Sequence, residues 1–243
     1  MEIIDKPLDW TDLTNLPEKF RDVIIIYRGV VNYKYDLIPA IGRPRAKVTK
    51  DGKKNLNFEN TVYSQLLDRF KREATLHLDK YPTFGNDTDE EWEFIARHHG
   101  LPTRLLDWTK SQLIAAYFAC EKSGVIGGDS VDAAIYGLKI TEHVSRSGHN
   151  NINLNKENDV WFYVSQNLSK RVTAQRGIFT IHDTPQKPFD SEDIIKWKIE
   201  SNNCGEIRYY LNKCGISRET LFPDLDGIAE NLRWLYKFQL LDL

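Results

Sequence analysis

The segment RHHGLPTRLLDWTKS, residues 97–111, holds the densest group of reactive side chains in the chain. His98 can donate or accept a proton near neutral pH. Arg104 carries a planar guanidinium that suits a phosphate or a carboxylate, and Thr103 projects beside it from a turn stiffened by glycine and proline. Asp107 either pairs with Arg104, three residues away, or caps the helix that follows. Such varied chemistry in one short segment is typical of a preorganised site.

Two features of this segment also have plain structural interpretations. His98 and His99 are consecutive at a predicted helix end, so their side chains point about 100° apart and only one can face a given site. A histidine at a helix C-terminus is also stabilised as a cation by the helix dipole. Trp108 can shape a pocket for a planar ring, but covering the core is the more frequent role of a single tryptophan.

Arg28 is a second candidate, because it follows the apolar run IIIY that predicts a buried strand over residues 22–27. This prediction puts Arg28 at the exit of the strand, with Tyr27 before it and Gly29 after it. A guanidinium there can grip a phosphate or a carboxylate, and the glycine allows a backbone or a ligand to come close. Pairing with a nearby aspartate explains the arginine equally well.

Two further pairs of polar residues lie later in the chain. Arg171 and Gln175 are four residues apart and share a helix face just ahead of a predicted strand. They can contact the same ligand as Arg28, or they can brace the sheet. Asp224 and Asp226 can hold a metal or act as acid and base, but two carboxylates at the head of a helix more often stabilise its dipole.

The elements that must position these groups are visible in the hydrophobic pattern. Apolar residues at three- and four-residue spacing, with capping signals, predict helices over residues 9–20, 58–77, 88–99, 111–122, 165–175, 204–213 and 217–238. Short apolar runs predict further strands over residues 133–140, 160–164, 177–182 and 193–200. Because βαβ alternation is absent, we expect one α+β domain with a mixed or antiparallel central sheet flanked by amphipathic helices.

The residues that begin, end and connect these elements give more specific expectations. Thr88 and Glu91 have the spacing of a capping box, and Gly100 should end their helix in a left-handed conformation. Ser111 and Gly124 should begin and end the next helix. Loops are expected over residues 31–57 and 147–158, and the first contains six Lys or Arg against one Asp between residues 43 and 54. That basic loop is either merely solvated or a positive patch for phosphates or nucleic acid.

Composition excludes several classes of protein. The net charge of −2 has no long single-sign tail, and no apolar stretch approaches the ~18 residues of a membrane span. Gly-rich phosphate loops, GxSxG and HExxH are all absent. The three cysteines, Cys120, Cys204 and Cys214, lack zinc-ligand spacing, so no metal is expected. Together with an acidic N-terminus unlike a signal peptide, these features predict a cytoplasmic protein.

Four motifs together resemble the FRG domain family, named for an F/Y-R-G motif. They are Tyr27-Arg28-Gly29, HHGLPTRLLDWT from residue 98, RxxxQxGxFT from residue 171 and LFPDLDG from residue 221. The resemblance spans about residues 22–230, and we treat the whole chain, residues 1–243, as one domain. Family members are mostly uncharacterised bacterial and phage-borne modules, so the resemblance implies a defence or toxin system.

The Arg-Gly pair is also similar to the first motif of ADP-ribosyltransferases, whose strand arginine grips the phosphate and ribose of NAD. That resemblance implies an ADP-ribosyltransferase-like fold and an NAD substrate. It assigns NAD binding to Tyr27, Arg28, Gly29, Thr103, Arg104, Trp108 and Arg171, and catalysis to His98, Asp107 and Gln175. The Ser-Thr-Ser and Gln-x-Glu motifs are absent, and the one Glu-x-Glu, residues 91–93, lies on a predicted helix, so the catalytic glutamate is unassigned.

We therefore expect one cleft in which Arg28, His98, Thr103, Arg104, Asp107 and Gln175 converge on a phosphate-containing small molecule, with a protein or nucleic acid as a further acceptor and no membrane partner. A second hypothesis is a nucleotide- or nucleic-acid-processing enzyme that uses His98 as acid or base. A third is a non-catalytic sensor or interaction module in which these groups are internal bracing. The position of Arg28 relative to Arg104 tests the convergence.

Overall fold

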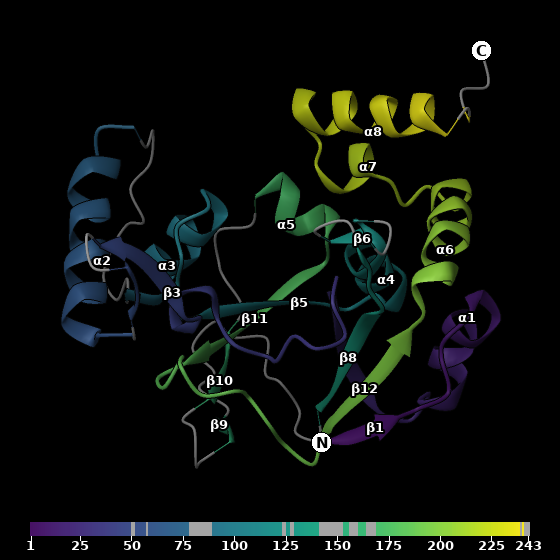
Figure 1. Cartoon of the computed structure of the whole chain (residues 1–243), viewed down its shortest axis with the longest axis horizontal. Coiled ribbons are helices and arrows are strands. Elements are labelled where there is room, and N and C mark those ends of the chain that lie inside the picture. Colours follow the sequence, from purple (N-terminus) through teal and green to yellow (C-terminus); the bar gives the residue numbers. More distant parts are fainter. Residues whose placement is uncertain are drawn as a thin grey trace.

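A computed structural model describes residues 1–49, 52–56, 58–77, 89–122, 125–126, 129–140, 153–155, 160–163, 169–238 and 240. Its centre is an eight-stranded sheet in the order β1-β12-β8-β2-β5-β11-β10-β9 (Figure 1). The strands are β1 (Glu2–Ile4), β2 (Ile24–Val30), β5 (Leu105–Thr109), β8 (Ala133–Ile140), β9 (Asn153–Asn155), β10 (Val160–Tyr163), β11 (Gly177–His182) and β12 (Ile194–Ile199). Only β1 and β12 pair in parallel among these strands. The predicted α+β class with a mixed sheet is confirmed.

Helices cover one face of this sheet in two groups. The helices are α1 (Trp10–Lys19), α2 (Asn60–Ala74), α3 (Asp89–His98), α4 (Gln112–Cys120), α5 (Lys170–Ala174), α6 (Ser201–Lys213), α7 (Arg218–Leu221) and α8 (Leu225–Lys237). Tyr27 on β2 packs in a core cluster with α1, α4 and α6. Leu105 on β5 packs in another with Phe94 of α3 and Val172 of α5. Tyr27 is paired with Thr109, and Thr109 lies four residues from Leu105 on β5, so the side chains of all three point to the same face of the sheet. Both clusters therefore lie on that face.

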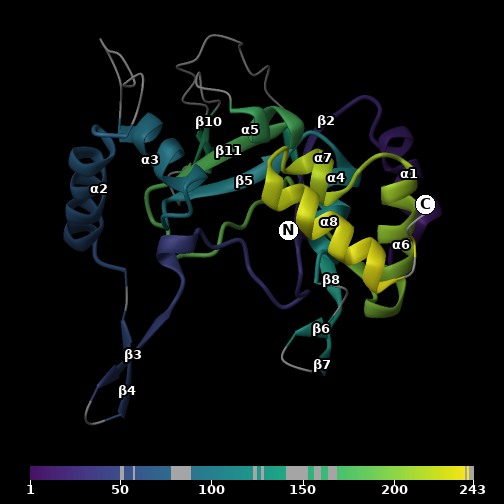
Figure 2. The same ribbon diagram turned by 90° about the horizontal axis from the view of Figure 1, so that it is seen from above.

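The opposite face is covered by irregular chain. Its cluster contains Leu106 and Trp108 of β5 together with Leu37 and Phe189 from two connecting segments. The backbone N–H of Phe189 donates to the carbonyl of Leu37 at 2.9 Å, which joins these segments into one cover. The hairpins β3 (Arg45–Thr49) with β4 (Gly52–Leu56) and β6 (Val125–Ile126) with β7 (Asp129–Ser130) extend away from the body (Figure 2).

The sheet is nearly divided between β2 and β5. Seven residue pairs join β2 to β8 and five join β5 to β11, but only Tyr27 and Thr109 pair β2 with β5. Beyond that pair the two strands separate, so the backbone groups along their facing edges need other partners. This split creates the space for a site in the middle of the sheet.

Helix α4 determines the course of β2 next to the split. A side-chain carbon placed on Gly29 would lie 1.9 Å from the carbonyl oxygen of Ala115 and 2.6 Å from the nitrogen of Ala119, both in the α4 backbone. Helix and strand therefore approach too closely for any other residue. Six of the nine residues of α4 are buried and none is exposed, in keeping with its apolar sequence, and Ser111 caps it by accepting from the N–H of Ile114.

The structure corrects the predicted elements at four places. Residues 105–109 form a central strand, which the sequence did not predict between the turn at residues 100–104 and the helix cap at Ser111. Strand β2 continues to Val30, so Arg28 lies within it, and the basic loop contains the β3–β4 hairpin and a 3₁₀ turn, Ala40–Gly42. The final predicted helix is broken into α7 and α8, because Pro223 cannot continue a helix. Thr88, Gly124, residues 165–168 and most of the loop 147–158 lie outside the described residues.

The contact at Gly29 predicts a large difference between two glycine substitutions. Gly29→Ala should lower the free energy of unfolding by about 3 kcal/mol or more, because rigid helix backbone must move. Gly205→Ala, within α6 and with no atom near the added carbon, should raise it by about 0.5–1 kcal/mol. Urea unfolding of both variants measures the difference, and similar effects would contradict the packing described.

Candidate functional site

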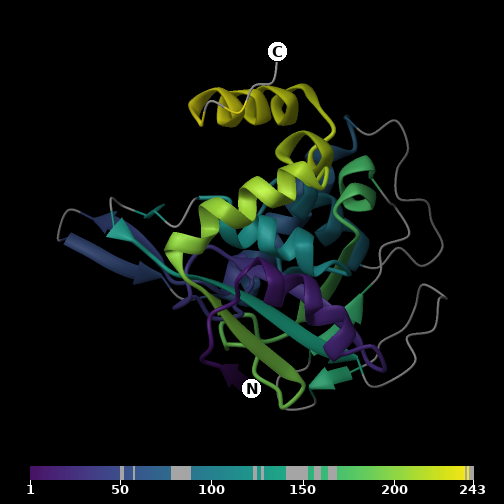
Figure 3. The same cartoon turned by 90° about the vertical axis from the view of Figure 1, so that its right-hand side faces the viewer.

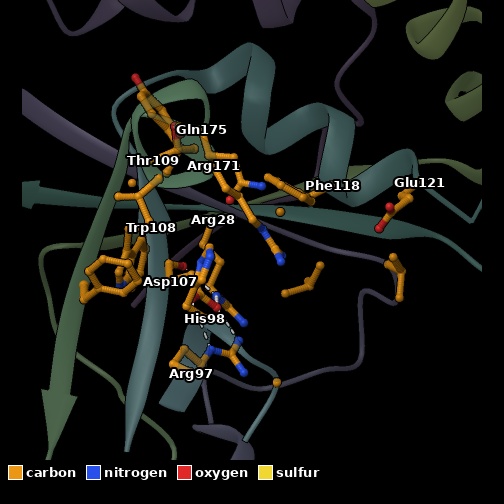
Figure 4. A pocket seen from close by; sticks show the side chains of 18 of the residues that line it. Arg28, Arg97, His98, Asp107, Trp108, Thr109, Phe118, Glu121, Arg171 and Gln175 are labelled. Carbon is orange, nitrogen blue, oxygen red and sulfur yellow. Dashed lines mark hydrogen bonds and ion pairs between the residues drawn. The ribbon is translucent and has the colours of Figure 1, made fainter. Parts of the chain in front are cut away.

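A cavity of about 430 Å³ opens over the split between β2 and β5 (Figure 4). The two strands form its floor, and its walls come from α3, α4, α5 and the segment that follows β2. Its polar lining includes Arg28, Arg43, Arg97, His98, Asp107, Glu121, Arg171 and Gln175. Cavities of this size are typical of small-molecule sites.

Asp107 is the centre of the polar network in this cavity. Arg28 donates from Nη1 to the backbone carbonyl of Asp107 at 2.5 Å and lies 3.4 Å from its Oδ2. Arg97, from the last turn of α3, grips the same carboxylate through Nε at 3.1 Å from Oδ1 and through Nη2 to Oδ2. Burial alone would favour the neutral carboxyl, but the two guanidinium groups outweigh it and lower the pKa of Asp107 to about 2. Asp107 is therefore an anion that orients two arginines.

Burial outweighs the attraction of Asp107 at the other cavity arginines. It lowers the pKa of Arg28, Arg43 and Arg171, and repulsion from Arg97 adds to the effect at each of them. The groups nevertheless remain cationic, because the guanidinium does not deprotonate in proteins. Arg171 stacks 4.4 Å over the ring of Phe222, and within the described residues no carboxylate pairs with it. Cations held in a partly dry cavity favour an anionic ligand.

His98 and not His99 borders this cavity. The two rings contact each other edge to face with centroids 5.2 Å apart. Burial, followed by the neighbouring His99 and Arg171, lowers the pKa of His98 below its usual 6.5. The imidazole is therefore neutral near pH 7 and can accept a proton. As expected for consecutive helical positions, only one of the two histidines faces the cavity.

The end of α5 ties the cavity wall to neighbouring elements. Thr109 donates from Oγ1 to the carbonyl of Gln175 at 2.8 Å, and the Gln175 amide donates to the carbonyl of Leu221 at 3.2 Å. Gln175 therefore borders the cavity while it braces β5 against α7, the structural alternative that its sequence left open.

Thr103 and Arg104 lie away from the cavity, which corrects the predicted convergence. Arg104 donates to Glu93 at 2.6 and 2.9 Å and to Asp183 at 2.8 Å, and Thr103 is fully buried. Neither residue lines the cavity. Both precede β5, so a rise of about 3.3 Å per residue carries Arg104 roughly 10 Å along the chain from Asp107. Of the two alternatives that the sequence left open for Asp107, neither is observed: its carboxylate pairs with Arg28 and Arg97, and Ser111 caps α4.

Three other expected site residues have mainly packing roles. Trp108 borders the cavity, but its indole N–H donates to Thr180 at 3.0 Å within the core of the opposite face. Tyr27 is 4% exposed and belongs to the core under α4, and Gly29 makes the close contact with that helix. Of the motif Tyr27-Arg28-Gly29, the arginine brings the charged group to the cleft.

The two aspartates near the C-terminus serve the helix dipole. Asp224 caps α8 by accepting from the N–H of Gly227 at 2.7 Å, and Asp226 is exposed in the first turn. Within the described residues no cluster of three His, Cys, Asp or Glu could hold a metal ion. Asp224 and Asp226 thus have the structural role at a helix N-terminus that the sequence favoured, and Asp224 fills it as the N-cap.

Several cavity residues were missed from the sequence, namely Arg43, Arg97, Tyr35, Phe118 and Glu121. Arg97 directly precedes the two histidines, so its position at the end of a predicted helix could have identified it as a cavity residue. Arg43 belongs to the basic segment, whose first arginine turns toward the cleft while the following hairpin extends outward (Figure 2). Glu121 follows the last residue of α4 and pairs with Arg218 at 2.6 Å.

Comparison with protein families agrees with the first two of the four sequence motifs. The FRG domain model matches residues 24–125, so this segment of the chain is similar to FRG domains, while the motifs from residues 171 and 221 lie outside the match. The match includes Arg28, Arg43, Arg97, His98 and Asp107, and it ends before α5. No curated protein and no solved structure matches the chain. Within the described residues no helix is both long and apolar enough to traverse a bilayer.

The Asp107 network predicts a specific pH dependence of stability. The folded pKa of Asp107, about 2, lies below its ordinary value of 3.8, so the contribution of this carboxylate to stability is present at neutral pH and disappears as the pH falls toward 2. Asp107→Asn should therefore lower the unfolding free energy near pH 7. As the pH falls toward 2, the unfolding free energies of the variant and of the unsubstituted chain should become equal. We expect about 1 kcal/mol, because the side chain is 42% exposed and solvent screens its pairs.

Denaturant unfolding between pH 2 and 7 tests this expectation. As a control, Asp22→Asn, whose side chain is 89% exposed, should change the unfolding free energy at neutral pH by no more than about 0.5 kcal/mol. If Asp107→Asn and the unsubstituted chain differ by the same amount at every pH, the carboxylate does not have the assigned role.

Proposed function

We propose that this FRG domain binds a phosphate-containing nucleotide in the cleft between β2 and β5, with NAD as the leading candidate. One observation carries the proposal. The cavity is lined by four arginines and two carboxylates, which leaves an excess of two positive charges in a partly buried space. A diphosphate carries two negative charges, and guanidinium groups bind its oxygens through paired hydrogen bonds.

Individual residues have distinct parts in this proposal. Arg28 and Arg97 are oriented by Asp107 and form one anion-binding centre on the floor. Arg171, on the opposite wall, has its guanidinium stacked on Phe222 and forms a second centre. Aromatic side chains of Phe94, Phe118, Tyr35 and Phe179 also line the cavity and offer apolar surfaces for the rings of a dinucleotide.

The proposed chemistry is cleavage of the bond between nicotinamide and ribose. Nicotinamide leaves with the bonding electron pair and becomes neutral, while an oxygen of water or of an acceptor bonds to the ribose carbon and loses its proton. His98 is the candidate base, because its imidazole is neutral at pH 7. Glu121 is the second cavity carboxylate and is the candidate group for stabilising the cationic ribose.

Two other functions remain as alternatives to be separated by experiment. A nucleic-acid-processing enzyme would need a basic groove beside His98, whereas the β3–β4 hairpin extends away from the body of the molecule (Figure 2). A non-catalytic sensor would bind the same ligand without cleaving it. A bacterial or phage defence system, which the family resemblance implies, suits either an NAD-cleaving enzyme or a sensor.

Substitution of the cavity arginines tests the proposal. With NAD labelled in the nicotinamide ring, Arg28→Ala should lower the kcat/KM of nicotinamide release at least a hundredfold, and Arg171→Ala about tenfold, because each removes charge-assisted hydrogen bonds. Arg171→Ala is the cleaner variant, since within the described residues it breaks no ion pair. Arg21→Ala, with a 71% exposed side chain outside the cavity, is the matched control.

Binding and turnover distinguish the alternatives. Calorimetry with ADP-ribose measures the diphosphate site directly, and Arg171→Ala should weaken binding about tenfold. Binding without nicotinamide release would favour the sensor. Absence of both, with protein and nucleic-acid acceptors supplied, would reject NAD as the ligand.

The assignment of His98 as the base also predicts how the rate of the reaction depends on pH. The kcat/KM for nicotinamide release should fall as the pH drops through the pKa of His98, which lies below 6.5 because burial and neighbouring cations oppose protonation. His98→Asn should lower the rate at pH 7 by about a hundredfold and remove this acid limb. A variant that retains the same acid limb would show that another group is the base.

A further inference from the structure

Helix α8 has its apolar side facing outward. Among its residues only Gly227 and Asn231 are buried. By contrast, Leu225 is 83% exposed, Leu232 48% and Tyr236 75%, with Ile228 also exposed. An amphipathic helix on a globular protein normally turns its apolar stripe to the core. Figure 3 shows α8 at the margin of the molecule, outside α6 and α7.

Polar and cation–π contacts hold α8 in this orientation. Asn231 donates to Glu219 of α7 at 3.3 Å, and Glu230 pairs with Arg218 at 2.7 Å. On the inner side of the helix, the guanidinium of Arg208 lies 4.6 Å over the ring of Trp234. These contacts fix which side of α8 faces inward, so the helix cannot simply rotate to bury its leucines.

The exposed stripe repeats at alternating spacings of three and four residues. Its exposed residues are Leu225, Ile228 and Leu232, with Tyr236 on its border, and the half-buried Leu235 continues the same spacing. This is the pattern of a helix that packs along a second helix. The charges beside it are ordered: Asp226 lies in the first turn, Arg233 and Lys237 lie in the last two turns, and helical geometry puts all three on the same border of the stripe.

We propose that the apolar stripe of α8 is the interface of a homodimer, in which two copies of α8 pack antiparallel about a two-fold axis. This arrangement brings Asp226 beside the partner's Arg233 and lets Ile228 pack on the partner's Leu232. Every contact then occurs twice, as an isologous interface requires. A membrane surface fits less well, because the exposed part of α8 carries acidic as well as basic residues.

The size of the interface sets its strength. The 13 residues of α8 span about 20 Å, so a single helix pair lies at the low end of specific interfaces. The dimer therefore forms at micromolar rather than nanomolar concentrations. This surface is separate from the arginine-lined cavity, and its test does not depend on which ligand the cavity binds.

Light scattering during gel filtration of the full chain, from about 1 to 200 µM, tests the dimer. The mass should rise from one chain to two with concentration, and Leu232→Glu should weaken association by roughly a hundredfold or more. Val62→Glu is the matched control, because Val62 is 45% exposed on α2 and outside the stripe. A chain that stays monomeric throughout, or a dimer that survives Leu232→Glu, overturns the proposal.

Charge reversal tests the antiparallel arrangement itself. Asp226→Arg and Arg233→Asp should each weaken the dimer roughly tenfold, because each replaces two attractions with two repulsions. The double variant should recover the original dissociation constant to within about threefold. Circular dichroism verifies that all variants keep their helices. A double variant as weak as the single ones, or a monomer that sediments with phosphatidylglycerol vesicles, overturns the two-fold pairing.

Discussion

The pairing of Asp107 with Arg28 and Arg97 joins two halves of a sheet that share a single residue pair at their boundary. Where the backbone ladder between β2 and β5 stops, side-chain hydrogen bonds take over its role. The backbone carbonyl of Asp107 would otherwise face the gap without a partner, and Arg28 supplies the missing donor. The same guanidinium therefore closes the gap in the sheet and lines the cavity above it.

This double role explains why the cavity is positively charged. A split sheet needs donors that reach across several ångströms, and arginine combines that reach with several N–H groups. One carboxylate satisfies two of the arginines, while burial disfavours the charge of Arg43 and Arg171. The protein thus holds cations in a partly dry space. An anion bound there would offset the free-energy cost of their desolvation. Under the proposed function, stability and ligand binding would use the same residues, so a substitution in this network would change both.

Local patterns in the sequence predicted most of the helices and strands, but not how they pair. The cap at Ser111 depends only on neighbouring residues and was predicted from them. The strand Leu105–Thr109 was not, because its five residues lie between a proline turn and a helix cap and acquire strand structure only through pairing with β11. Arg28 and His98 were recognised by residue type, whereas Arg104 was misassigned because its partner Glu93 comes from another element. Cross-sheet partners of this kind are set by topology, which a local pattern does not contain.

The cavity and the C-terminal helices are physically continuous. Glu121 borders the cavity and pairs with Arg218, and Arg218 also pairs with Glu230 on α8. The guanidinium groups of Arg171 and Arg218 both stack on the ring of Phe222. Under the proposed function, a ligand phosphate that drew the guanidinium of Arg171 toward it would remove this group from Phe222, the residue that directly follows α7. Occupancy of the cavity and the seating of α8 therefore act on a shared set of contacts, and linkage makes any such coupling reciprocal.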